Sequence, residues 1–369
     1  MEFSKEDSLK CKGFAILIML FHHMYMSPER YEGYVISFAP LSEEMVNQIA
    51  DFLKICVGLY VFVSAFGLTV SYKNWKGRLS AFSLHRTFKM MFVFYVVYVC
   101  AVLVSFVVAK DWNIWAVYGG KGRLAALFYM GIDFLGLADL FGTPSLNVTW
   151  WYMSFAIVLV FLVPVLNRLY DKVNGVWLLV MSVLLPKALG LSAGSHVIRY
   201  LPLLILGILC ARTGLIGKCK EVLDRKGRGK KAIYFLVLLF FYVLLFRLRE
   251  GVLKSSFIAV WDSVVPFLTV CLLSLFINRI RVLSHILSFF GTYSTLIFLT
   301  HTFIRAYWYP DFIYGHTSAW LNYGILVVTS LLVAVILDVL MKAIRVRKIE
   351  NMLDKKLVAF MERERHSGF

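Results

Sequence analysis

Residues 12–23 read KGFAILIMLFHH, so a lysine opens an apolar run that ends in two histidines. His23 follows Lys12 by eleven positions, and eleven α-helical steps return a side chain to within about 20° of its starting direction. In a helix the two residues therefore share one face, about 16 Å apart along the axis. This is about half of the ~30 Å hydrocarbon thickness of a bilayer. We interpret the stretch as a membrane span that carries a histidine at mid-membrane.

The composition of the whole chain agrees with this interpretation. Hydrophobic residues make up 60% of the 369 residues, charged residues only 17%, and the mean hydropathy is +0.75. These values predict an all-α, polytopic membrane protein rather than a soluble one. We expect ten transmembrane helices, at about 10–27, 48–72, 88–109, 149–167, 175–191, 199–216, 232–248, 258–278, 286–309 and 321–343.

An eleventh apolar run, 124–140, contains two glycines and two aspartates, and we interpret it as a re-entrant or interfacial segment. With that run excluded, most of the 39 lysines and arginines fall in the loops on one side, which the positive-inside rule makes cytoplasmic. Both termini are then cytoplasmic, and Arg305 is among the few cations of the outer loops. The net charge of +17 is explained by topology and anionic lipid, so no nucleic-acid partner is expected.

The sequence divides into one large part and a short tail. Residues 1–345 are predicted to form a single transmembrane domain. Residues 346–369 alternate basic and acidic side chains without a long apolar run, and predict a helix at the cytoplasmic surface.

Polar side chains inside spans are costly and are often functional. His22 and His23 point about 100° apart on a helix, so His23 shares the face of Lys12 and His22 does not. His301 lies at a depth similar to that of His23, in the run FFGTYSTLIFLTH, and Ser294 is two turns earlier on the same face. The alternative for each histidine is a helix-packing hydrogen bond, and for Ser294 a bond to its own backbone.

Two further groups admit a functional and a structural interpretation. Trp150, Trp151 and Tyr152 begin a span on the outer side, where aromatic belts are common, but they could also stack on a sugar acceptor. Arg86 and Lys89 share one face and either reflect positive-inside charge or bind phosphates. Asp262, near the outer end of its span, is expected to pair with an outer-loop arginine, and the alternative is a second polar wall of the cavity. No ligand spacing for a metal accompanies the histidines, so no metal is expected.

These elements together resemble the bacterial integral-membrane acyltransferases of acyltransferase family three, over nearly the whole chain. Members carry a basic residue and a histidine eleven positions apart in the first span, as Lys12 and His23 are. Lysine replaces the usual arginine at position 12, and Ala156 stands where many members have a glutamate. The remaining motifs match VFVSAFG at 61–67, HRTFK at 85–89, TWWYMS at 149–154 and GTYSTLIFLTH at 291–301.

The resemblance implies an O-acyltransferase that moves an acetyl or other short acyl group from cytoplasmic acetyl-CoA to a hydroxyl of an extracytoplasmic carbohydrate. On this view Lys12, Arg86 and Lys89 hold the donor's phosphates. His23 acts as general base or carries the acyl group covalently. His301 and Ser294 steady the thioester carbonyl or orient the base, and His22 is a further catalytic candidate.

The competing hypothesis is a transporter or flippase for a lipid-linked sugar, with the intramembrane histidines as a proton relay. Inverted repeats and broken helices, which typify transporters, are not visible in the sequence. The expected partners are the lipid bilayer and an envelope glycan or glycolipid acceptor, and the chain could form a homo-oligomer. The expected location is the plasma or inner membrane, crossed many times.

Overall fold

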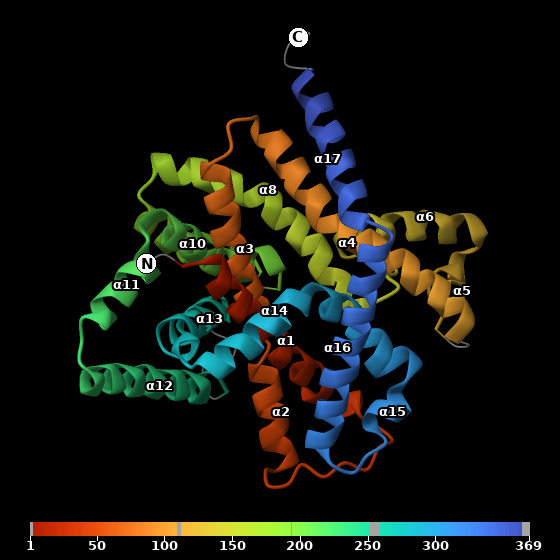
Figure 1. Cartoon of the computed structure of the whole chain (residues 1–369), viewed down its shortest axis with the longest axis horizontal. Coiled ribbons are helices and arrows are strands. Elements are labelled where there is room, and N and C mark those ends of the chain that lie inside the picture. Colours follow the sequence, from red (N-terminus) through yellow and green to blue (C-terminus); the bar gives the residue numbers. More distant parts are fainter. Residues whose placement is uncertain (1–2, 109–111, 193, 251–257, 364–369) are drawn as a thin grey trace. The chain divides into compact units, whose positions relative to one another are not determined.

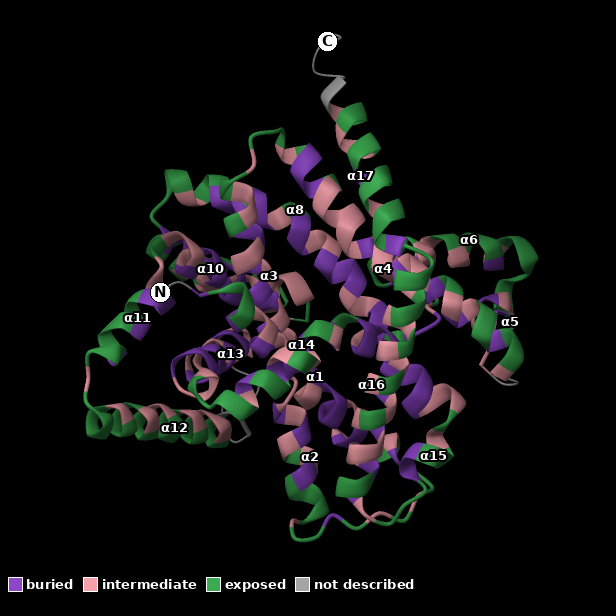
Figure 2. Ribbon diagram, viewed as in Figure 1, coloured by how far each residue is buried: buried purple, intermediate pink, exposed green. Residues whose placement is uncertain are grey.

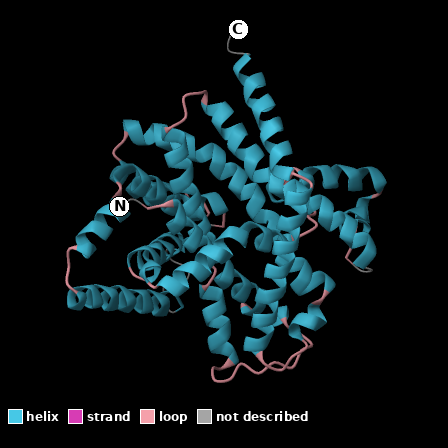
Figure 3. Cartoon of the chain, viewed as in Figure 1, coloured by secondary structure: helices cyan, strands magenta, loops and turns pink. Residues whose placement is uncertain are grey.

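A computed structural model describes residues 3–108, 112–192, 194–250 and 258–363 (Figure 1). The described residues form helices joined by short loops and contain no strand (Figure 3). The all-α prediction is therefore confirmed. Position 109 of one expected span and residues 364–369 of the expected tail lie outside the described residues.

Eight helical segments among the described residues are long and apolar enough to cross a membrane. They coincide with eight of the ten expected spans. The ninth and tenth correspond to α1 (Lys5–Tyr25) and to α9 (Gly175–Ala188), which has only 14 residues. The eight segments are Glu43–Lys73, Leu79–Val108, Val148–Lys172, His196–Thr213, Arg228–Leu248, Ile258–Arg279, Arg281–Trp308 and Ala319–Ala343.

The run at 124–140 does not form a continuous span. It gives α6 (Arg123–Phe134), of 12 residues, and the single turn α7 (Ala138–Phe141). Gly136 lies between them with φ of 70°, a conformation that glycine adopts without steric cost. At ~1.5 Å per residue, neither helix is long enough to cross ~30 Å of hydrocarbon.

The chain forms two compact units, and the first contains Met1–Lys73 and Val165–Ser294. In this unit α3 (Ile55–Lys73) packs against α1, α10 (His196–Thr213) and α13 (Ile258–Leu275). By contrast, the apolar window of α12 (Arg228–Glu250) has no buried residue (Figure 2). A helix that is apolar yet unburied is suited to face lipid. The unit also contains α2 (Glu43–Phe52), α11 (Leu215–Asp224), η1 (Pro28–Arg30), η4 (Ile277–Arg279) and most of α14 (Arg281–Thr302).

Two glycines bring α1 and α14 into backbone contact within the first unit. A Cβ added to Gly13 would overlap the carbonyl oxygen of Leu287, and one added to Gly291 would overlap the carbonyl oxygen of Leu9. Only glycine permits such a close helix crossing, as in other membrane helix pairs. Gly291 is also the first residue of the GTYSTLIFLTH motif, so this motif position has a packing role.

The second unit contains Asn74–Pro164 and Thr295–Phe369. Its long helices are α4 (Leu79–Val108), α16 (Ala319–Ala343) and α17 (Val346–Arg363), and α17 packs against both α4 and α16. The shorter elements are α5 (Ile114–Tyr118), η2 (Gly119–Lys121), η3 (Val148–Trp150), the first part of α8 (Trp151–Lys172), the π-helix η5 (Phe303–Trp308) and α15 (Pro310–Tyr314).

Asp133 organises the short helices of the second unit. Its buried carboxylate accepts hydrogen bonds from the Tyr118 hydroxyl at 2.5 Å, the Leu146 amide at 2.7 Å and the Ser145 hydroxyl at 2.8 Å. Burial raises the pKa of the Asp133 carboxyl above its ordinary value, although these hydrogen bonds act in the opposite direction. The carboxylate thereby ties α5 and α6 to the loop that precedes the tryptophan motif.

Candidate active site

The predicted site residues of the first unit are Lys12, His22, His23 and Ser294. Since α1 is continuous from Lys5 to Tyr25, Lys12 and His23 lie on one helix as expected. His22 is buried, and its Nδ1 is 2.6 Å from the carbonyl oxygen of Ala50. A carbonyl can only accept, so Nδ1 carries the proton and fixes His22 to α2. His23 is half-buried, with its ring centroid 5.1 Å from that of His22.

Ser294 is buried on α14, and its hydroxyl donates to the carbonyl oxygen of Gly291 at 2.8 Å. A hydrogen bond from Ser294 to its own helix backbone is the alternative to a functional role that the sequence analysis gives for this residue. The hydroxyl oxygen keeps lone pairs that can accept a further hydrogen bond.

His301, in the second unit, is fully buried at 0% exposure near the end of α14. Its Nδ1 lies 2.8 Å from the carbonyl oxygen of Phe298 and 3.2 Å from that of Ile297. Both partners are acceptors, so Nδ1 is the protonated nitrogen. The other nitrogen, Nε2, is 3.1 Å from the hydroxyl of Thr302.

A chain of buried polar groups leads away from Nε2 of His301. The hydroxyls of Thr302 and Thr149 are 3.2 Å apart, and Thr149 donates to Oδ1 of Asn147 at 2.7 Å. The Thr302 hydroxyl has one proton, which it can give either to His301 or to Thr149. Thr149 always donates to Asn147, because an amide oxygen only accepts, so the Thr302 hydroxyl is the group that can change its acceptor when the protonation of His301 changes. Asn147, Thr149 and Thr302 were not singled out by the sequence, because their meeting depends on tertiary structure.

The tryptophan motif lies against the segment that carries His301. Trp150 is 2% exposed, and its indole nitrogen donates to the carbonyl oxygen of Leu299 at 3.1 Å. The rings of Tyr152 and Phe298 meet edge to face with centroids 5.8 Å apart. Trp150 is thus part of the packing around His301, whereas Trp151 and Tyr152 are half-buried.

Arg86 and Lys89 lie on α4, and their surroundings differ. Lys89 Nζ is 3.6 Å from Oδ2 of Asp354, a residue of α17. The other oxygen of Asp354 is 2.6 Å from Nδ1 of His85. Arg86 is half-buried and makes no ion pair with the rest of the described chain.

Arg305 is a buried cation that sequence reasoning places in an outer loop. The π-helix η5 extends α14 beyond its last α-helical residue. Arg305, four residues after His301, therefore lies on a helix, and it is only 3% exposed. Its Nη1 donates to the Tyr314 hydroxyl at 3.1 Å, and its Nε has no acceptor among the described residues. Isolated π-helical turns occur often at functional sites. The π-helix is therefore a sign that Arg305 has a functional role, and it is visible in the structure but not in the sequence.

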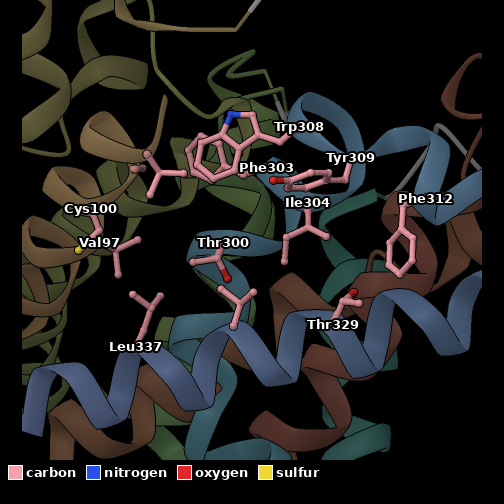
Figure 4. A pocket seen from close by; sticks show the side chains of 13 residues that line it. Val97, Cys100, Thr300, Phe303, Ile304, Trp308, Tyr309, Phe312, Thr329 and Leu337 are labelled. Carbon is pink, nitrogen blue, oxygen red and sulfur yellow. The ribbon is translucent and has the colours of Figure 1, made fainter. Parts of the chain in front are cut away.

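A cavity of about 550 Å³ lies in the second unit between α4, α16 and the segment from α14 to α15 (Figure 4). Two of its polar groups, the hydroxyls of Thr300 and Thr329, donate to backbone carbonyls of their own helices. The walls are otherwise mostly apolar, so the cavity suits hydrocarbon rather than a sugar. Its lining includes Val97, Ile304, Trp308, Phe312, Val333 and Leu337.

One structural expectation is confirmed in the first unit. The buried Asp262 forms an ion pair with the half-buried Arg199, an arginine of a predicted outer loop. Within the described ranges, no group of three or more His, Cys, Asp or Glu side chains is arranged to hold a metal ion.

Comparison with known proteins gives one match. A protein-family model described as an acyltransferase domain matches residues 11–339. The match includes every predicted site residue and ends within α16, so α17 lies beyond it. No curated protein and no solved structure matches the chain.

Proposed function

Since the chain belongs to acyltransferase family 3 and carries multiple membrane-spanning helices, we propose that it is an O-acyltransferase of the plasma or inner membrane. It moves an acetyl or similarly short group from cytoplasmic acyl-CoA to a hydroxyl of an extracytoplasmic carbohydrate. The observation that carries the proposal is the family match over residues 11–339.

Three cations are proposed to bind the donor's phosphates. Phosphates cannot enter hydrocarbon, so they must stay at a membrane surface. Lys12 is half-buried near the start of α1, while Arg86 and Lys89 are in the first turns of α4. Lysine at position 12 supplies charge without the planar bidentate fork of arginine. Arg86 supplies that fork and has no carboxylate partner among the described residues.

His23 is proposed to act as the general base. It removes the proton of the acceptor hydroxyl while that oxygen attacks the thioester carbonyl, and the resulting tetrahedral intermediate expels the CoA thiolate, which takes up a proton. An imidazole can both accept and release a proton near neutral pH, which suits both proton transfers. The Nδ1–H group of His22 donates a hydrogen bond to the carbonyl oxygen of Ala50, so His22 positions the end of α1 in this scheme. In the alternative route His23 carries the acyl group covalently.

Groups around the reaction centre are proposed to have supporting roles. The half-buried rings of Trp151 and Tyr152 are suited to stack on a sugar acceptor. His301 and the Thr302 hydroxyl can respond together to a proton, since the Thr302 hydroxyl can donate either to Nε2 of His301 or to Thr149. The Ser294 proton is committed to Gly291, so a contact with the donor would use its oxygen as acceptor.

The decisive experiment compares wild type and His23→Ala in lipid nanodiscs supplied with radiolabelled acetyl-CoA. Release of free CoA and label transferred to an envelope glycan extract are both measured. We expect both signals in the wild type and a loss of at least about 100-fold in the variant. His316→Ala, a change in an exposed loop histidine, is the matched control and should be fully active.

A fully active His23→Ala enzyme would remove His23 from the mechanism. Sugar-lipid flux across proteoliposomes without an acyl donor, with no CoA release, would support a transporter instead. Mass spectrometry of envelope glycans with and without the gene then identifies the acceptor.

A further inference from the structure

The C-terminal helix α17 continues beyond α16 and packs against α4 in the second unit (Figure 1). It begins three residues after the end of α16, and the turn between them contains Arg345 with φ of 55°. Arg345 is the single non-glycine residue with positive φ within the described ranges. This conformation costs an L-residue about 1 kcal/mol or more, and such strain is frequent at switch segments.

Docking of α17 depends on one carboxylate. Asp354 is 6% exposed and contacts two nitrogen-bearing side chains of α4, His85 at 2.6 Å and Lys89 at 3.6 Å. His85 and Lys89 are four residues apart and therefore adjacent on one face of the helix. The ring of His85 is in turn stacked on that of Trp75, with centroids 5.4 Å apart.

Apart from Val346 at its start, which is 4% exposed, α17 buries little apolar surface. Between residues 347 and 361, Asp354 is the single buried side chain, whereas the large apolar residues Ile349, Met352 and Phe360 are 43%, 50% and 65% exposed. Since burial of apolar surface is what normally fixes a helix, α17 lacks the usual means of permanent attachment. Its attachment to α4 therefore depends largely on the contacts of Asp354.

The contacts of Asp354 fall on the basic segment HRTFK at 85–89. Lys89 is one of the cations proposed to bind the donor's phosphates, and a carboxylate and a phosphate compete for the same ammonium group. Arg86, between His85 and Lys89, forms no such pair among the described residues. The helix that provides the carboxylate lies outside residues 11–339, the part that matches the family.

We propose that α17 is an autoinhibitory latch on the donor site, in which Asp354 competes with the phosphates of acyl-CoA for His85 and Lys89. The proposal rests on the proposed function, since it assumes that the donor binds at this segment. Donor binding and docking of α17 then exclude one another, and the apparent affinity for the donor falls in proportion to the fraction of molecules that are latched.

The first test measures the affinity of the full-length protein for CoA itself, by calorimetry in nanodiscs. We expect Asp354→Asn to lower the Kd about fivefold, because the neutral amide holds His85 and Lys89 less strongly than the carboxylate does. Glu350→Gln is the matched control: it makes the same charge change on the same helix, and Glu350 has no partner among the described residues. Its Kd should equal that of the wild type.

The second test needs no variant of Asp354 and so remains valid if that variant folds poorly. Trypsin cleaves after Lys355 and Lys356, next to Asp354 in α17. We expect CoA to accelerate this cleavage several-fold in the wild type, and not in Lys89→Gln. The comparison reports the release of α17 directly.

The outcomes separate the latch from the donor site. If the wild type binds CoA but Asp354→Asn leaves the Kd unchanged or raises it, the latch is wrong and the proposed function stands. If CoA binds while trypsin cleavage is unaffected, the latch is likewise overturned. If no variant binds CoA, the donor site itself is wrong, and the latch fails with it.

Discussion

The indole nitrogen of Trp150 donates to the carbonyl oxygen of Leu299, 3.1 Å away, two residues before His301. Two motifs that are about 150 positions apart in the sequence are therefore joined by one buried hydrogen bond. The tryptophan of the first motif supports the backbone that carries the histidine of the second. This relationship gives the first prediction.

Trp150→Phe should remove this bond while keeping an aromatic ring in the site. The Leu299 carbonyl oxygen still accepts a second, longer hydrogen bond from the Asn147 side-chain amide at 3.4 Å, so it keeps one donor. We expect a loss of about 1 kcal/mol in unfolding free energy and a clear fall in acyl transfer. Thermal unfolding and CoA release measure the two effects. Trp151→Phe should change stability less, and an equal effect of both variants would contradict this role of Trp150.

Thr302→Val should interrupt the polar chain from His301 while keeping a β-branched side chain of similar shape. We expect kcat to fall about tenfold or more, with little change in the KM for acetyl-CoA, since general acid–base contributions are typically of this size or larger. Thr300→Val is the control, because its hydroxyl donates only to the Leu296 carbonyl of its own helix. Equal rates in the two variants would show that the polar chain does not take part in proton transfer.

Arg305→Gln should separate stability from activity. A buried guanidinium that has no carboxylate partner among the described residues is costly to fold, so the amide should leave the melting temperature unchanged or raise it. We nevertheless expect acyl transfer to fall at least about tenfold, because the cation lies one turn from His301 and can bind a polar group of a substrate. A Tyr314→Phe variant tests the hydrogen bond alone. A fully active Arg305→Gln enzyme would show that the charge has no role in transfer.

Gly291→Ala should force α1 and α14 apart. The added Cβ overlaps the Leu9 carbonyl, which is backbone and cannot rotate away, so we expect a loss of about 2 to 3 kcal/mol. Gly324→Ala in α16 is the matched control, because a Cβ there meets nothing within 4 Å. It should be neutral or stabilising by up to about 1 kcal/mol. Equal melting temperatures for the two variants would exclude a close crossing at Gly291.

Sequence reasoning predicted the helices well and their tertiary partners less well. Apolar runs located eight spans because span length and hydropathy are local properties. The pairing of Asp262 with an outer-loop arginine was predictable because a buried carboxylate needs a cation. The burial of Arg305 was not, since it depends on the π-helical extension of α14. The sequence also did not predict the contacts of Trp150 and Asp354, because each of these contacts joins residues that are far apart in the chain.

The shortness of α9 has a consequence for the membrane around the protein. Its 14 residues extend about 21 Å, against a hydrocarbon thickness of ~30 Å. If α9 crosses the bilayer, the bilayer beside it must become thinner, at a cost of a fraction of a kcal/mol for each ångström of mismatch. This free-energy cost is smallest in lipids with shorter acyl chains. The activity of the reconstituted enzyme should therefore depend on lipid chain length, with its optimum in a thin bilayer.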